Sequence, residues 1–174
     1  MAYNPDDGLV WGRSTFRISA RALDVLACCM HVDSHLMQSS RRDHHVVLER
    51  SLDQHTCVVA TTHKIGYGFT EREFVQCLRW RQVRPGAYQV VNLPVEHGDR
   101  PNSQGLVRGL LHYMIEIESA GTGEATVTQV LHGEPRGSIP LWLSNMHAGA
   151  VARSLQRLLA RTFCAGRRLS VAEA

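Results

Sequence analysis

Hydrophobic positions near the end of the chain recur with the spacing of one helix face. Between Ile139 and Phe163 they form one broad stripe, which comprises Leu143, Met146, Ala150, Val151, Leu155, Leu158, Leu159 and Phe163. Pro140 suits the first turn, because a helix makes no use there of the N–H that proline lacks. The pattern predicts a helix of about 24 residues, roughly 36 Å long, whose stripe needs a large apolar partner.

Upstream of this helix, apolar and polar residues alternate with the period of β-strands. The expected strands are 14–19, 45–51, 57–63, 74–83, 88–95, 106–117 and 125–132. Residues 21–37 instead have helical spacing and predict one helix or two short ones. The breaks between strands are rich in glycine, proline and aspartate, so we expect antiparallel hairpins between successive strands.

This order of elements indicates the fold class. One strand, a helix or helix pair, six strands and a long helix are typical of an α+β fold rather than an alternating α/β fold. We predict a curved antiparallel sheet of about seven strands wrapped around the long C-terminal helix, an arrangement that can enclose a pocket. Residues 1–13 are expected to be a lead-in, 14–166 the domain and 167–174 a tail.

Composition narrows the class of protein. A chain of 174 residues fits one domain with a sizeable core, and 44% hydrophobic with 20% charged residues indicates a globular fold. The net charge of +3 comes from scattered arginines rather than a basic cluster, so we expect no nucleic-acid partner.

Cysteine usage and the N-terminus bear on location. Five cysteines, with Cys28 and Cys29 adjacent, do not suit a disulfide framework and favour a reducing, cytoplasmic setting. The first residues are acidic where a signal peptide needs a basic start, and no stretch approaches the roughly 20 apolar residues of a membrane span.

Several short motifs, in this order and spacing, resemble the START family of lipid-transfer domains. The resemblance covers about residues 46–163 and rests on TEREFV (70–75), YQVVN (88–92), Pro101 with GLVRG (105–109), VTQV (127–130), GSIPLWL (137–143) and Asn145. It implies the helix-grip form of the predicted α+β fold.

Two features depart from the family pattern. START domains usually begin with an extra helix and two strands, for which this chain has no room, so it resembles the smaller helix-grip plan of the superfamily that includes the birch-pollen allergen. The chain is then either a complete minimal domain or a truncated sequence. Glu73 stands where the family usually has aspartate, which keeps the charge and lengthens the side chain.

The resemblance implies that the domain holds one lipid or sterol-like molecule between sheet and C-terminal helix, for transfer or sensing. Alternation in 74–83 and 106–117 places one apolar face inward. The expected lining is Thr61, Phe74, Gln76, Leu78, Trp80, Val107, Leu111, Tyr113, Trp142, Leu143, Met146 and Ala150. The alternative is that these side chains fill a plain core and the domain is a protein-interaction module without ligand.

Two details refine this expectation. Some sterol-binding members pair a buried acid with an arginine, whereas Thr61 and Leu78 stand at those positions here, so Thr61 and Gln76 are the available polar groups. The loop with Tyr67 and Phe69 lies where the family has its gating loop. Its rings either form a lid that makes transient membrane contact or fold back into the core.

We find no signature of metal or catalytic chemistry. His31 and His35 are one helical turn apart, but no third ligand is obvious, so chance spacing explains them better than a metal site. No G-x-S-x-G motif occurs. Some helix-grip relatives are cyclases or hydrolases, yet no inward acid–base pair is convincing, and we expect neither enzyme activity nor a cofactor.

Overall fold

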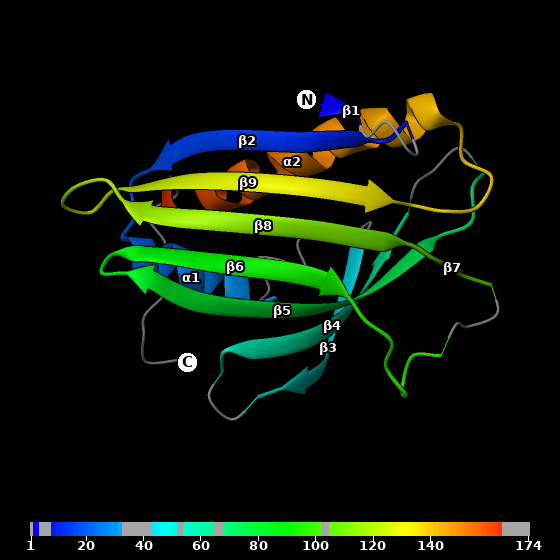
Figure 1. Ribbon diagram of the computed structural model, residues 1–174, viewed down its shortest axis with the longest axis horizontal. Helices are drawn as coiled ribbons and strands as arrows, with labels where there is room; N and C mark the ends of the chain where they lie inside the picture. The colour runs from blue at the N-terminus through cyan, green and yellow to red at the C-terminus, as the bar shows by residue number, and fades with distance from the viewer. Residues whose placement is uncertain are drawn as a thin grey trace.

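The computed structural model describes residues 2–3, 8–32, 43–51, 54–64, 68–101 and 105–164. Within them, nine strands form one sheet and two helices lie on the same face of it (Figure 1). The elements are β1 Ala2–Tyr3, β2 Val10–Ile18, α1 Ala22–Met30, β3 Asp43–Arg50, β4 Thr56–His63, β5 Arg72–Arg84, β6 Ala87–Pro94, β7 Val107–Arg108, β8 Leu110–Ser119, β9 Ala125–Glu134 and α2 Leu141–Cys164.

The sheet is antiparallel along its main path, β1-β2-β9-β8-β6-β5-β4-β3. Successive strands from β3 to β6, and then β8 and β9, pair as hairpins, as short turn-rich connections favour. The exception to sequential order is β2, which pairs with β9 and so joins the two ends of the chain. The α+β helix-grip fold with an antiparallel sheet is thus confirmed.

Strand register sets which side chains share the inner face, the face that the helices cover. One row across the sheet runs Cys57, Leu78, Asn92, Tyr113 and Leu131, because each is the direct partner of the next. Since side chains alternate along a strand, the positions two residues away in each strand also point inward. The predicted inner face of residues 74–80 therefore has the expected parity.

The two helices cover different parts of that face. α2 packs mainly on β2 and β9, and α1 packs on β6, β8 and β9. α1 ends at Met30, with the His31 N–H bonded to the Ala27 carbonyl at 3.0 Å. It is shorter than the stretch of 21–37, whose residues from 33 onward lie outside the described part of the chain.

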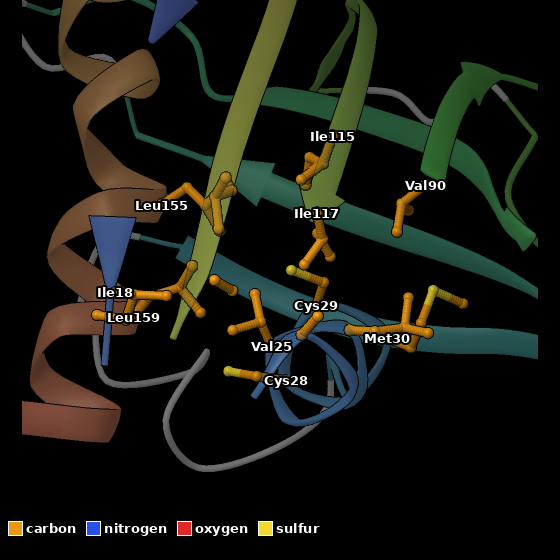
Figure 2. Close-up of a cluster of buried hydrophobic side chains, with 14 of the residues drawn as sticks. Ile18, Val25, Cys28, Cys29, Met30, Val90, Ile115, Ile117, Leu155 and Leu159 are labelled. Carbon is orange, nitrogen blue, oxygen red and sulfur yellow. The ribbon is translucent and has the colours of Figure 1, made fainter. Parts of the chain in front are cut away.

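The apolar core lies where both helices meet the sheet (Figure 2). Val25 of α1, Ile117 of β8 and Leu159 of α2 are each 0% exposed. Figure 2 shows side chains of α1 directed at β8, with Leu155 and Leu159 of α2 beside Ile18. The leucine stripe at the end of the chain thus anchors α2, as the helical spacing predicts.

Two strand predictions needed correction. β2 begins at Val10 rather than at residue 14. The expected strand 106–117 divides at Gly109: β7 pairs with the start of β5 in parallel, and β8 pairs with β6 and β9. The division occurs because β6 ends at Pro94, opposite Gln76, so that the earlier residues of β5 accept β7 as their neighbour.

Candidate functional site

Most of the lining residues expected in the strands lie on the inner face. Gln76 and Leu78 of β5 and Thr61 of β4 are buried, at 5%, 1% and 3% exposure. Leu78 belongs to the core beneath α1, and Trp80 packs beside it, with its indole N–H donating to the Gln54 carbonyl at 3.1 Å. The side chains of Leu78 and Trp80 therefore fill the core, whereas those of Gln76 and Thr61 lie toward the first residues of β5.

Tyr113 occupies the middle of the inner face. Its direct neighbours in the sheet, Asn92 and Leu131, are 0% and 1% exposed, while Tyr113 itself and nearby Leu111 keep part of their surface accessible. Burial raises the pKa of the Tyr113 hydroxyl far above its ordinary value, with smaller contributions from Cys29 and Cys57. Tyr113 is therefore partly enclosed rather than fully buried.

Three buried amide side chains lie on this face. Gln76, Asn92 and Gln129 are 5%, 0% and 6% exposed, and Gln76 Nε2, Asn92 Oδ1 and Gln129 Oε1 have no hydrogen-bond partner among the described residues. Asn92 and Gln129 were not among the predicted site residues. The sequence contained a pattern that could have identified them, since both have inward parity in strands whose other inward positions are mostly apolar.

Phe74 and Gly109 form a close contact at the end of the face. A Cβ placed on Gly109 would lie 2.4 Å from Phe74 Cε1, so the ring occupies the space that the glycine leaves. A glycine within a strand can leave room for another molecule, but here Phe74 takes that room. Val107, beyond the break, lies in β7 beside Arg72 and does not share the strand of Leu111.

The predicted lining residues in the first turns of α2 differ in burial. Leu143 is 2% exposed, whereas Trp142 and Met146 are 67% and 51% exposed. The structure thus brings Leu143 into the body of the domain and directs the other two outward, because Asn145 ties this turn to β2 by donating to Gly8 O and accepting from the Val10 N–H. The Ala150 side chain lies outside the described part.

The predicted gating loop is described in part. Phe69 is half-buried beside the start of β5, and Tyr67 lies outside the described residues. Arg72 follows, 2% exposed, and donates to the carbonyls of Thr70, Pro135 and Arg136. Burial lowers the pKa of Arg72. This arginine holds the loop before β5 against the segment between β9 and α2.

The two charged residues at the start of β5 lie on opposite faces, because Arg72 shares the parity of Phe74 and Glu73 does not. Glu73 has the opposite parity to Phe74 and is 1% exposed; its carboxylate accepts from Arg108 at 2.8 Å and from Arg100 at 3.4 Å. By contrast, the inward residues from Phe74 to Trp80 of β5 and those of β6, β8 and β9 are uncharged. They are Phe74, Gln76, Leu78, Trp80, Tyr88, Val90, Asn92, Leu111, Tyr113, Ile115, Ile117, Ala125, Val127, Gln129 and Leu131.

Other candidate chemistry is limited. Burial raises the pKa of the Cys28 and Cys29 thiols, so both are poor nucleophiles. Among the described residues no three His, Cys, Asp or Glu side chains are grouped to hold a metal ion. No described helix is long and apolar enough to cross a membrane.

A groove of about 440 Å³ lies on the outer face of β5 and β6. Its lining includes Cys77, Arg79, Val91 and Leu93, and of the predicted site residues only Trp80. The groove is separate from the buried amides of Gln76, Asn92 and Gln129, which lie on the inner face of the sheet.

Comparison with known proteins agrees with this geometry. The START domain family model matches residues 65–162, more than half of the chain. No curated protein matches the sequence.

Solved structures show the same fold. Human STARD10 has a TM-score of 0.80 at 16% identity, covering 93% of this chain and 66% of its own; the chain thus spans less than two thirds of that relative. A STAR-related lipid transfer protein from Xanthomonas axonopodis has a TM-score of 0.79 at 20% identity, covering 92% and 89%. The lipid transfer and protein localization domain of human StarD13 has a TM-score of 0.73 at 22% identity, covering 89% and 77%.

Proposed function

Because the chain belongs to the START domain family, we propose that it binds a single lipid or other apolar molecule between the inner face of the sheet and α2. The bound molecule would be carried or sensed rather than transformed. The inward positions of β5 from Phe74 to Trp80, and those of β6, β8 and β9, carry no carboxylate, imidazole or amine, which supports this role because general acid–base catalysis commonly uses such groups.

The observation that carries the proposal is the environment of Tyr113. Burial raises the pKa of its hydroxyl, yet the residue as a whole is not fully buried. We infer that the accessible part of Tyr113 faces the interior of the domain, between the sheet and α2. Leu111, Gln76 and Phe74 lie toward the same end of the inner face, whereas α2 packs mainly on β2 and β9. An apolar ligand placed there would cover surface that the fold leaves open.

A lipid must also leave a membrane to reach this site. Leu141, Trp142 and Met146 are exposed apolar side chains in the first turns of α2, at 53%, 67% and 51%. Apolar groups gathered on a surface commonly mark a contact site. We propose that this turn of α2, with the loop that contains Tyr67 and Phe69, touches the membrane transiently during ligand exchange.

The test is whether the protein carries lipid. The full chain should be purified from cells without detergent and measured by native mass spectrometry, then incubated with liposomes of mixed cellular lipids and measured again. We expect one bound lipid per chain in at least one sample. Protein that stays empty in both would refute the proposal.

Empty protein would instead favour a protein-interaction module without ligand. The outer-face groove is the observation in favour of that second candidate, because Leu93, 52% exposed, and Val91 leave apolar surface uncovered there.

A further inference from the structure

Gln76 and Asn92, two of the three buried amides of the inner face that lack a hydrogen-bond partner among the described residues, lie on neighbouring strands. Gln76 is 5% exposed and Asn92 0%, and neither Gln76 Nε2 nor Asn92 Oδ1 has a hydrogen-bond partner among the described residues. Buried polar atoms are nearly always paired, since leaving them unpaired costs stability. Hydrophobic side chains would suit a plain core better at both positions.

Register places the two amides side by side. Asn92 is the direct partner of Leu78, two residues along β5 from Gln76, so Gln76 and Asn92 are diagonal neighbours on adjacent strands. Tyr113 is the direct partner of Asn92 on its other side. Asn92 therefore lies between Gln76 and Tyr113, which is not fully buried.

The orientation of Asn92 is fixed by its own hydrogen bond. Its Nδ2 donates to the Leu111 carbonyl at 3.0 Å, and rotating the amide would bring two acceptor oxygens together. Asn92 thus presents an acceptor, Oδ1, and Gln76 presents a donor, Nε2. A donor beside an acceptor matches a hydroxyl group, which both accepts and donates.

We propose that Gln76 and Asn92 bind the uncharged, hydroxyl-bearing polar end of the ligand; this inference rests on the proposed lipid-binding function. Gln76 Nε2 donates to the hydroxyl oxygen, and the hydroxyl hydrogen is donated to Asn92 Oδ1. The ligand class is then a neutral lipid that ends in a hydroxyl, such as an acylglycerol, a sterol or a ceramide.

Charge argues against a phosphate at this place. The inward positions of β5 from Phe74 to Trp80, and those of β6, β8 and β9, are uncharged, and burying a charge without an opposite partner is costly. Of the buried arginines at this end of the sheet, Arg72 donates to three carbonyl groups, and Arg108 pairs with Glu73 of the outer face at 2.8 Å. A zwitterionic head group would therefore bind less well than a hydroxyl.

Matched lipid pairs test the choice of polar end. Liposomes should present dioleoylglycerol with dioleoylphosphatidylcholine, cholesterol with cholesterol sulfate, and ceramide with sphingomyelin, so that the apolar part is shared within each pair. Native mass spectrometry of the full chain then reports which member is bound. We expect the hydroxyl member in every pair that binds. Preference for the charged member overturns the inference while leaving lipid binding intact, whereas no uptake from any pair overturns both.

Substitution tests the two residues. Gln76→Leu should reduce retention of the hydroxyl lipid about tenfold, abolish the preference within the pair and leave the melting temperature unchanged or higher. Gln82→Leu, at an exposed position of the same strand, is the matched control and should keep the preference. An unchanged preference in Gln76→Leu, or a lowered melting temperature with binding unaffected, would show that Gln76 is structural and overturn the inference.

Discussion

Arg108 donates from Nη2 to Glu73 Oε2 at 2.8 Å, in a pair of which Glu73 is 1% and Arg108 8% exposed. The same Arg108 nitrogen donates to the Arg100 carbonyl at 2.7 Å, and Arg100 Nη1 donates to Glu73 at 3.4 Å. Glu73 and Arg108 are direct partners in the parallel pairing of β5 with β7. One buried carboxylate thus fastens both β7 and the segment after β6 to the sheet.

We expect Glu73→Gln to destabilise the protein by about 3–5 kcal/mol, because it leaves the buried Arg108 without a counter-charge. Urea unfolding followed by tryptophan fluorescence measures the loss. Glu96→Gln is the control, since that carboxylate lies 4.0 Å from Arg108 Nη1 but is 91% exposed; it should change the free energy of unfolding by less than about 0.5 kcal/mol. Equal effects at both positions would contradict a special role for Glu73.

The contact between Phe74 and Gly109 gives a second prediction. Gly109→Ala puts a Cβ 2.4 Å from Phe74 Cε1, so we expect a loss of about 1–3 kcal/mol in the free energy of unfolding, as overpacking typically costs. Phe74→Leu in the same chain should recover part of this loss, because the smaller side chain vacates the space.

The control for this cycle is Gly98→Ala, where an added Cβ meets nothing within 4 Å. Thermal unfolding of the unaltered protein, the two single variants and the double variant gives the coupling energy between positions 74 and 109. Additive effects would show that the ring moves aside freely.

The same contact shows why one strand was mispredicted. Residues 106–117 alternate without a break in the sequence, and period alone predicts a single strand. The division at Gly109 follows from the Phe74 ring and from the end of β6 at Pro94. Both causes are far from Gly109 in sequence, so no local pattern contains them.

The inner face was easier to predict than the helix facing it. Alternation assigned Gln76 and Leu78 correctly, because a strand has only two faces. A helix has more possible orientations, and the apolar pattern of α2 cannot distinguish exposed Trp142 from buried Leu143. That rotation is set by Asn145, which hydrogen-bonds to Gly8 and Val10 over 130 residues away.

α2 should therefore respond differently at its two ends. Leu159→Ala removes a 0% exposed side chain, and we expect a loss of about 2–5 kcal/mol. Met146→Glu, at a 51% exposed position, should leave the melting temperature unchanged. If this turn touches membranes, Met146→Glu should also slow lipid uptake from anionic liposomes, because the new charge is repelled there.

Stopped-flow uptake of a fluorescent lipid measures that rate, with uptake at equilibrium as the control for pocket integrity. An unchanged rate would contradict membrane contact by this turn. A large loss of stability in Met146→Glu would mean that the side chain packs in the fold after all.

The buried thiols predict a fall in stability at alkaline pH. Burial raises the pKa of Cys28 and Cys29, and Thr162 offsets part of this at Cys28 by hydrogen bonding. An unfolded thiol loses its proton near pH 8.5, while the folded protein retains it. The native state then binds more protons than the unfolded state, so stability falls as pH rises.

We expect the free energy of unfolding to be insensitive to these thiols below about pH 8 and to fall above it, by at most about 1.4 kcal/mol per pH unit for each group. Urea unfolding between pH 7 and 10 measures the slope. Cys29→Ala should make the slope shallower than in the unaltered protein, whatever it does to absolute stability. An unchanged slope in Cys29→Ala would contradict a contribution of this buried thiol to the pH dependence.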